Sequence, residues 1–106
     1  MSTLDNIKIE KAKIGDLNGI VDLEIECFKE DAFSKEQFRY LIKKAKGEFV
    51  VVRLKNKIIA YLVFLRRKNS IKYRIYSIAI TPEARGLGIA SKLLIYVRQI
   101  YSFYLK

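Results

Sequence analysis

Residues 77–94 read SIAITPEARGLGIASKLL, and this stretch decides the fold. Strand-like apolar residues lead into Thr81, a loop containing Gly86 and Gly88 follows, and a helix is predicted directly after the loop. The first turn of a helix presents unpaired backbone N–H groups and the positive end of the helix dipole, and glycines allow a ligand to approach the backbone closely. The stretch therefore predicts a strand–loop–helix unit that can hold a phosphate group.

Two better-known phosphate-binding loops are excluded by the same residues. The dinucleotide-binding fingerprint needs a third glycine and a later ribose-binding acid, and a Walker loop needs Gly-Lys-Ser/Thr after its glycines. Neither pattern is present after Gly88. On its own, a strand, two glycines and a helix are equally compatible with a purely structural turn.

The rest of the chain alternates between strand and helix periodicity in the order β-α-α-β-β-β-α. Residues 58–65 are apolar on both faces, which is typical of a central strand covered on both sides. The sequence therefore predicts an α+β fold, in which helices pack on a largely antiparallel sheet, and residues 1–106 form a single partial domain. The predicted strands are 7–11, 49–54, 58–65 and 71–80, and the predicted helices are 17–28, 34–45 and 88–104.

The ends of the first two helices carry recognisable signals. Asp16 is expected to cap the first helix, and Ser34 with Gln37 forms a capping box at the start of the second. Gly47 is expected to stop the second helix. A hydrophobic staple is expected from the two flanking phenylalanines, Phe33 and Phe38.

Cysteine and histidine usage limits the chemistry. Cys27 is the single cysteine and histidine is absent, so an internal disulfide, a His-dependent triad and most zinc sites are excluded, and no metal is expected. Cys27 lies among apolar residues, where a free thiol usually serves as a small buried hydrophobe.

The formal net charge of +10 attracts polyanions, which include nucleic acid, an anionic membrane and a phosphate-bearing cofactor. The basic residues are spread along the chain, so a solvated surface is favoured over a nucleic-acid site. The sequence contains no run of about 18 apolar residues and no apolar stretch near Met1, so neither a membrane span nor a signal peptide is expected. A cytoplasmic location follows as the expectation.

At this point the chain resembles a known family. Arg85-x-x-Gly88-x-Ala90 matches the Arg/Gln-x-x-Gly-x-Gly/Ala signature of the GCN5-related N-acetyltransferases, the GNAT family. Residues 27–34 (CFKEDAFS), followed by Phe38, resemble the helix 1–helix 2 region of the branch that acetylates protein N-termini. That branch includes the ribosomal-protein alanine acetyltransferase and Ard1-like enzymes. The resemblance covers roughly residues 6–98.

The resemblance implies acetyl-coenzyme A as cosubstrate. Backbone amides of the loop and the helix start would hold the pyrophosphate, Arg85 would add positive charge, and the end of the preceding strand would pair with the pantetheine arm and orient the thioester. The implied cofactor-binding residues are Ile78, Ala79, Ile80, Arg85, Gly86, Leu87, Gly88, Ile89, Ala90 and Ser91.

The family transfers the acetyl group directly to an amine within a ternary complex, so the expected function is acetylation of a primary amine, most specifically a protein N-terminal α-amine. Glu30 matches a position that contacts substrate in Ard1-like relatives, and Tyr76, with Tyr73, lies on the strand leading to the cofactor. These are the catalytic candidates. Glu30 is otherwise a solvated loop acid, and the tyrosines otherwise pack on neighbouring strands. The alternative function is a catalytically deficient coenzyme A-binding or protein-interaction module.

Family domains continue past the motif helix with a further β-α-β-β portion, which usually carries a tyrosine that acts as a general acid. This chain is expected to lack that portion. The strand 71–80 is then expected to be an open edge, and the last helix to carry surplus apolar surface. Pairing with a second copy, as a homodimer through that edge and helix, is the resulting expectation. Within the strand, Ile71, Tyr73 and Ile75 are predicted to share one face, and Tyr76, Ile78 and Ile80 the other.

Overall fold

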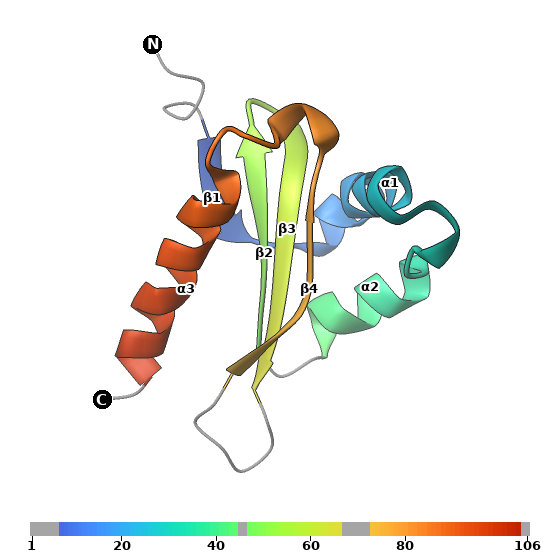
Figure 1. Cartoon of the computed structure of the whole chain (residues 1–106). Coiled ribbons are helices and arrows are strands. Elements are labelled where there is room, and N and C mark those ends of the chain that lie inside the picture. The colour runs from blue at the N-terminus through green and yellow to red at the C-terminus, as the bar shows by residue number, and fades with distance from the viewer. Residues whose placement is uncertain (1–6, 45–46, 67–72, 105–106) are drawn as a thin grey trace.

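The computed structural model of the protein describes residues 7–44, 47–66 and 73–104 (Figure 1). A four-stranded antiparallel sheet, ordered β1-β2-β3-β4, lies between α1 and α2 on one face and α3 on the other. The predicted α+β class and element order are confirmed. The strands are β1 (Ile7–Lys11), β2 (Gly47–Leu54), β3 (Lys57–Arg66) and β4 (Tyr73–Ile80); the helices are α1 (Leu17–Phe28), α2 (Lys35–Lys43) and α3 (Ile89–Tyr104); short 3-10 turns are η2 (Ile14–Asp16), η3 (Lys29–Asp31) and η4 (Pro82–Ala84).

The sheet has a hydrophobic core on each face, and β3 contributes to both. Its residues from Ile58 to Phe64 are all buried, which confirms the prediction of a central strand covered on both sides. Tyr61 packs with the residues of α1 and α2, whereas Leu62 packs with those of α3. Because successive strand residues point to opposite faces, a continuous apolar run serves two cores at once.

The start of α2 is as predicted and its end is not. The Gln37 amide donates to Ser34 Oγ (3.2 Å) and the Ser34 amide donates to Gln37 Oε1 (2.8 Å), which completes the capping box. The Phe33 and Phe38 rings meet edge to face at 5.9 Å. The helix ends at Lys43, however, and Gly47 is already the first residue of β2, paired with Leu65. The prediction that Gly47 ends the second helix is therefore wrong, because Gly47 belongs to β2 and pairs with β3.

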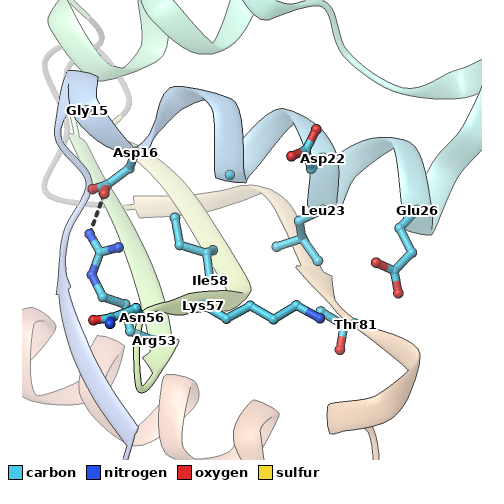
Figure 2. Close-up of a pocket in the computed structure, with 11 residues that line it drawn as sticks. Gly15, Asp16, Asp22, Leu23, Glu26, Arg53, Asn56, Lys57, Ile58 and Thr81 are labelled. Atoms are coloured by element: carbon cyan, nitrogen blue, oxygen red, sulfur yellow. Dashed lines mark hydrogen bonds and ion pairs between the residues drawn. The ribbon is translucent and has the colours of Figure 1, made fainter.

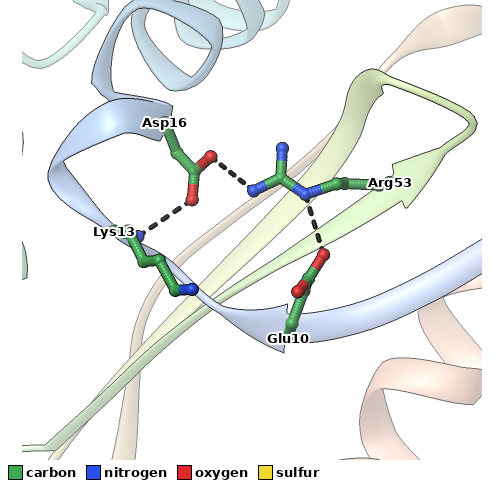
Figure 3. Close-up of polar contacts among 4 residues, drawn as sticks. All are labelled: Glu10, Lys13, Asp16 and Arg53. Carbon is green, nitrogen blue, oxygen red and sulfur yellow. Dashed lines mark hydrogen bonds and ion pairs between the residues drawn. The ribbon is translucent and has the colours of Figure 1, made fainter.

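The carboxylate of Asp16 is used differently from the expected helix cap. It accepts a hydrogen bond from the Lys13 amide (2.9 Å) and another from the Arg53 guanidinium, which also donates to Glu10 Oε1 (2.9 Å; Figure 3). No side-chain hydrogen bond caps α1. The hydrogen bond that Arg53 donates to Asp16 raises the pKa of Arg53. This cluster fastens β1, β2 and the turn before α1 to one another.

Removing the guanidinium is expected to destabilise the fold. In an Arg53→Met variant, the Asp16 carboxylate, which is 9% exposed in the native chain, loses its cation, and the free energy of unfolding should fall by about 1–3 kcal/mol. Lys11→Met is the matched control, since Lys11 is an exposed partner of Glu48 and such pairs contribute about 0–1 kcal/mol. Urea unfolding measures both variants, and equal losses would contradict the role assigned to Arg53.

A β-bulge at Tyr76 changes which residues of β4 share a face. Val63 pairs with Ser77 and Phe64 pairs with Ile75, so Tyr76 is the extra residue. The Tyr76 ring lies 5.7 Å from the Phe33 ring, on the side of α1 and α2. Ile78 and Ile80 pack instead with the residues of α3. The predicted common face of Tyr76, Ile78 and Ile80 is therefore wrong, because alternation fails across a bulge. Ile71, named in the same prediction, lies outside the described residues.

Candidate cofactor and acceptor site

The loop between β4 and α3 is anchored at both ends and turned by two glycines. Ala84 and Ile89 are buried in the α3 core, and between them Arg85, Gly86 and Gly88 are exposed. Gly86 and Gly88 have φ angles of +89° and +79°, the left-handed region that favours glycine. These two glycines therefore set the course of the loop toward α3.

The loop delivers the N-terminus of α3 to an open cavity. The Lys92 amide donates to the Gly88 carbonyl (3.1 Å), so the amides of Ile89, Ala90 and Ser91 precede the helical ladder and have no acceptor within it. A Cβ built on Gly86 or Gly88 would meet no atom within 4 Å. The cavity measures about 370 Å³, and its walls are formed by Ile80, Ala84, Arg85, Gly86, Gly88, Ile89, Ala90 and Ser91.

The structure thus brings most of the predicted cofactor residues to one place. Of the lining residues, Ala84 alone is absent from the sequence-predicted set. Ile78 and Leu87 lie apart from the cavity and pack with the α3 core, and Ala79 is buried on the α1 side of the sheet.

A polar contact that the sequence did not indicate lies at the end of β4. The Ile80 carbonyl accepts hydrogen bonds from Cys27 Sγ (3.3 Å) and Arg85 Nε (3.1 Å), and a second Arg85 nitrogen lies 3.9 Å from the same sulfur. The guanidinium therefore lies against the strand end and α1. Cys27 is only partly buried, so the interpretation as a buried hydrophobe describes its packing but misses this contact.

The two catalytic candidates lie on the α1–α2 side of the sheet. Glu30 is exposed on η3, and no hydrogen bond or ion pair within the described ranges holds its carboxylate. Tyr76 is 43% exposed on β4, which has no strand partner on its outer side within the described sheet, and its ring contacts Phe33. The structure shows no contact between Glu30 and Tyr76. Tyr73, the other candidate tyrosine, has a side chain outside the described part of the molecule.

Sequence reasoning missed a buried polar network behind Tyr76. Glu24 is 1% exposed; its Oε2 accepts from the Phe33 amide (2.9 Å) and its Oε1 accepts from the Tyr61 hydroxyl (2.6 Å). The Tyr61 hydroxyl also lies 2.8 Å from Ser77 Oγ. Burial, followed by the hydrogen bond to Glu24, raises the pKa of Tyr61. The available signal was the acid four residues after Ile20, on the buried stripe of α1.

A second cavity, of about 330 Å³, lies between α1 and the β2–β3 hairpin. Figure 2 shows that its wall carries charges of both signs, with Glu26 on the helix and Lys57 on the hairpin. It includes none of the predicted site residues, so it is separate from the cavity at the start of α3.

Two structural features bear on other classes of function. Within the described ranges, no three His, Cys, Asp or Glu residues cluster in a way that could hold a metal ion. In the same part of the chain, no helix combines the length and apolar character that crossing a lipid bilayer requires.

Comparison with known proteins identifies the family. The model of the acetyltransferase (GNAT) family matches residues 17–102, and the chain belongs to this family. A comparison with curated protein sequences finds no match.

Solved structures agree on the fold. The chain is similar to the ribosomal-protein-S18-alanine N-acetyltransferase of Escherichia coli, with a TM-score of 0.78 and 15% identity over 90% of this chain and 59% of that one. It is similar to the loading GNATL domain of CurA from Lyngbya majuscula, with a TM-score of 0.78 and 20% identity over 89% and 57%. It is also similar to an aminoglycoside acetyltransferase, meta-AAC0020, from an uncultured soil metagenomic sample, with a TM-score of 0.75 and 26% identity over 95% and 73%. The chain thus spans less than two thirds of the length of the first two.

Proposed function

We propose that this chain binds acetyl-coenzyme A at the β4–α3 loop and transfers the acetyl group to a primary amine. The cavity at the start of α3 is the main support for the proposal. Gly86 and Gly88, whose φ angles are positive, leave the cavity open, and the amides of residues 89–91, which have no acceptor within the helix, adjoin it. Such a helix start binds phosphate oxygens well, and the net charge of +10 favours the same anionic ligand. These residues fit the pyrophosphate of coenzyme A.

In this proposal each part of the site has a separate task. Acetyl-coenzyme A would supply the thioester, whose C–S bond breaks as the amine nitrogen binds the acetyl carbon, and coenzyme A would leave as the thiolate. The amides of Gly86 to Ser91 bind its pyrophosphate, and Arg85 adds positive charge beside them. The free edge of β4 at Ile78–Ile80 pairs with the pantetheine arm, and an N–H of that strand stabilises the oxyanion that forms when the amine attacks.

The acceptor is proposed to be a protein N-terminal α-amine, and the support is the sequence pattern of residues 27–34. The same segment carries Glu30, which is proposed to receive the amine proton directly or through water. Tyr76, which lies on the same side of the sheet, is proposed to orient the substrate. Glu30→Gln and Tyr76→Phe test these two roles, since unchanged turnover in either variant removes that residue from the mechanism.

Coenzyme A is expected to raise the thermal stability of the chain. A ligand that binds only the native state adds about 2.7 kcal/mol at a concentration one hundred times its Kd, which amounts to several degrees in Tm. Differential scanning fluorimetry across a coenzyme A titration measures the shift, with adenosine as a control that lacks the pyrophosphate. No shift at millimolar coenzyme A would refute the proposed site.

Turnover then separates an enzyme from a binding module. Thiol release is followed with acetyl-coenzyme A and a panel of peptides that have free N-termini. Stabilisation by coenzyme A without release from any peptide would favour the catalytically deficient alternative, because the cofactor cradle would then be present without transfer.

We also propose that two copies pair through β4 and α3. Within the described sheet, β4 has a strand partner on one side only, and Ile75, Leu94 and Ile95 are exposed on the two elements. An unpaired strand edge with apolar side chains favours association. Light scattering of the chain without coenzyme A tests the pairing, and a stable monomer at micromolar concentration would contradict it.

A further inference from the structure

We infer that Ser77 accepts a hydrogen bond from the incoming amine, and that the buried pair Glu24 and Tyr61 holds its hydroxyl in the orientation this requires. The inference rests on the proposed function and names a substrate-contacting residue in addition to Glu30 and Tyr76. Three observations carry it: the direction of the hydrogen bonds, the burial of Glu24, and the position of Ser77 beside the β-bulge.

The direction follows from counting protons. A backbone N–H can only donate, so Glu24 Oε2 accepts from Phe33, and the Tyr61 hydroxyl donates its single proton to Glu24 Oε1. Tyr61 has then no second proton for Ser77. The 2.8 Å contact between their oxygens therefore requires Ser77 to be the donor. With its own proton directed inward, Ser77 Oγ keeps only lone pairs for a ligand, so it is an acceptor.

The burial of Glu24 stabilises this direction of the hydrogen bonds. Glu24 is 1% exposed, and no lysine or arginine among the described residues pairs with it, so its carboxylate depends on the two donors. A buried carboxylate that lost a donor would carry the desolvation cost alone. The raised pKa of Tyr61 keeps that hydroxyl protonated at physiological pH. The network therefore has one stable hydrogen-bond direction, from Ser77 inward to Glu24.

The position of Ser77 suits contact with an amine. Ser77 is partly exposed on β4, immediately after the bulge that directs Tyr76 toward Phe33. The same strand continues into Ile80 at the cavity wall, so acceptor and cofactor would approach neighbouring parts of β4. An ammonium or amine donates N–H groups, which an oxygen with free lone pairs accepts, and the carboxylate at the far end of the network favours positive charge.

A purely structural role for the network makes a different prediction. If it only ties α1, β3 and β4 together, changes at all three residues should reduce stability and leave peptide recognition unaltered. If Ser77 contacts the amine, its removal should change turnover and the KM for the peptide, while the fold and the affinity for coenzyme A stay nearly constant.

The test compares wild type with Ser77→Ala, Ser77→Thr and Tyr61→Phe, using acetyl-coenzyme A and peptides with Ala, Ser or Met at the free N-terminus. Ser77→Ala is expected to lower kcat/KM for the peptide at least about tenfold, the loss typical of one hydrogen bond to a charged group. Its Kd for coenzyme A should stay within about twofold of wild type. Ser77→Thr keeps a hydroxyl on a strand-compatible side chain and should restore most of the activity.

Tyr61→Phe removes the partner that orients Ser77, and it should lower kcat/KM while Ser77 itself is intact. Unchanged kcat/KM in Ser77→Ala would overturn the inference and leave the proposed function standing. Wild type that binds coenzyme A but acetylates no peptide would overturn both the proposed transfer and the inference, and would leave coenzyme A binding standing. Wild type that fails to bind coenzyme A would instead refute the proposed function on which the inference depends.

Discussion

A Gly88→Val variant is expected to bind coenzyme A at least about tenfold more weakly than wild type. Gly88 has a φ of +79°, where a β-branched residue is strained by about 1–3 kcal/mol, and a side chain there would occupy the open space beside the helix start. Relieving the strain would turn the adjoining amides away from the cavity. Calorimetric titration with coenzyme A measures the loss.

Gly15→Val is the matched control. Gly15 is exposed, its added Cβ would also meet nothing within 4 Å, its φ is not positive, and it lies on the other cavity. This variant should keep the wild-type Kd for coenzyme A. If both variants lose affinity for coenzyme A equally, or if Gly88→Val keeps the wild-type affinity, the pyrophosphate does not bind at the start of α3 as proposed.

Phe38→Ala should cause a larger loss of stability than removal of the Arg53 guanidinium, about 3–5 kcal/mol in the free energy of unfolding. Phe38 has 0% exposure and its ring contacts Phe33, Phe49 and Tyr61. Truncation would leave a cavity at the point where α2 meets the sheet. Since domains are stabilised by only about 5–15 kcal/mol, this loss is a large fraction of the total stability.

The control lies on the same helix. Tyr40 is an aromatic residue of similar size, but it is 60% exposed, and Tyr40→Ala should change the free energy of unfolding by about 0.5 kcal/mol or less. Urea unfolding of both variants separates core packing from helix propensity. Comparable losses in the two variants would mean that α2 is not held by Phe38.

The overall fold could be predicted from local signals because they agree with one another. The double-faced apolar run of β3, the Ser34 capping box and the glycine loop before α3 each depend on neighbouring residues, and each was correct. Local signals led to wrong predictions where a tertiary contact overrides a local preference. Asp16 has the residue type and position of a cap, but Arg53, far along the chain, takes its carboxylate.

The loop geometry of the candidate site could also be predicted in part, whereas the roles of its residues stay predictions. Gly86 and Gly88 carry a conformational requirement that can be recognised in one sequence, and their neighbours follow from the helix start. The bulge at Tyr76 could not be recognised, because it depends on how β4 is registered against β3. The helical spacing of α1 places Glu24 on the buried stripe, but Tyr61 and Ser77 lie on other elements, so no spacing in the sequence identifies them as its partners.

The one-sided pairing of β4 has a consequence for how the protein would respond to its surroundings. If a second copy and the pantetheine arm both use that strand edge, they compete, and occupancy by one excludes the other. The apparent Kd for coenzyme A would then increase with protein concentration, and specific activity would rise on dilution. Abundant coenzyme A would keep the chains monomeric, so the cofactor concentration would control the oligomeric state of the protein as well as its activity.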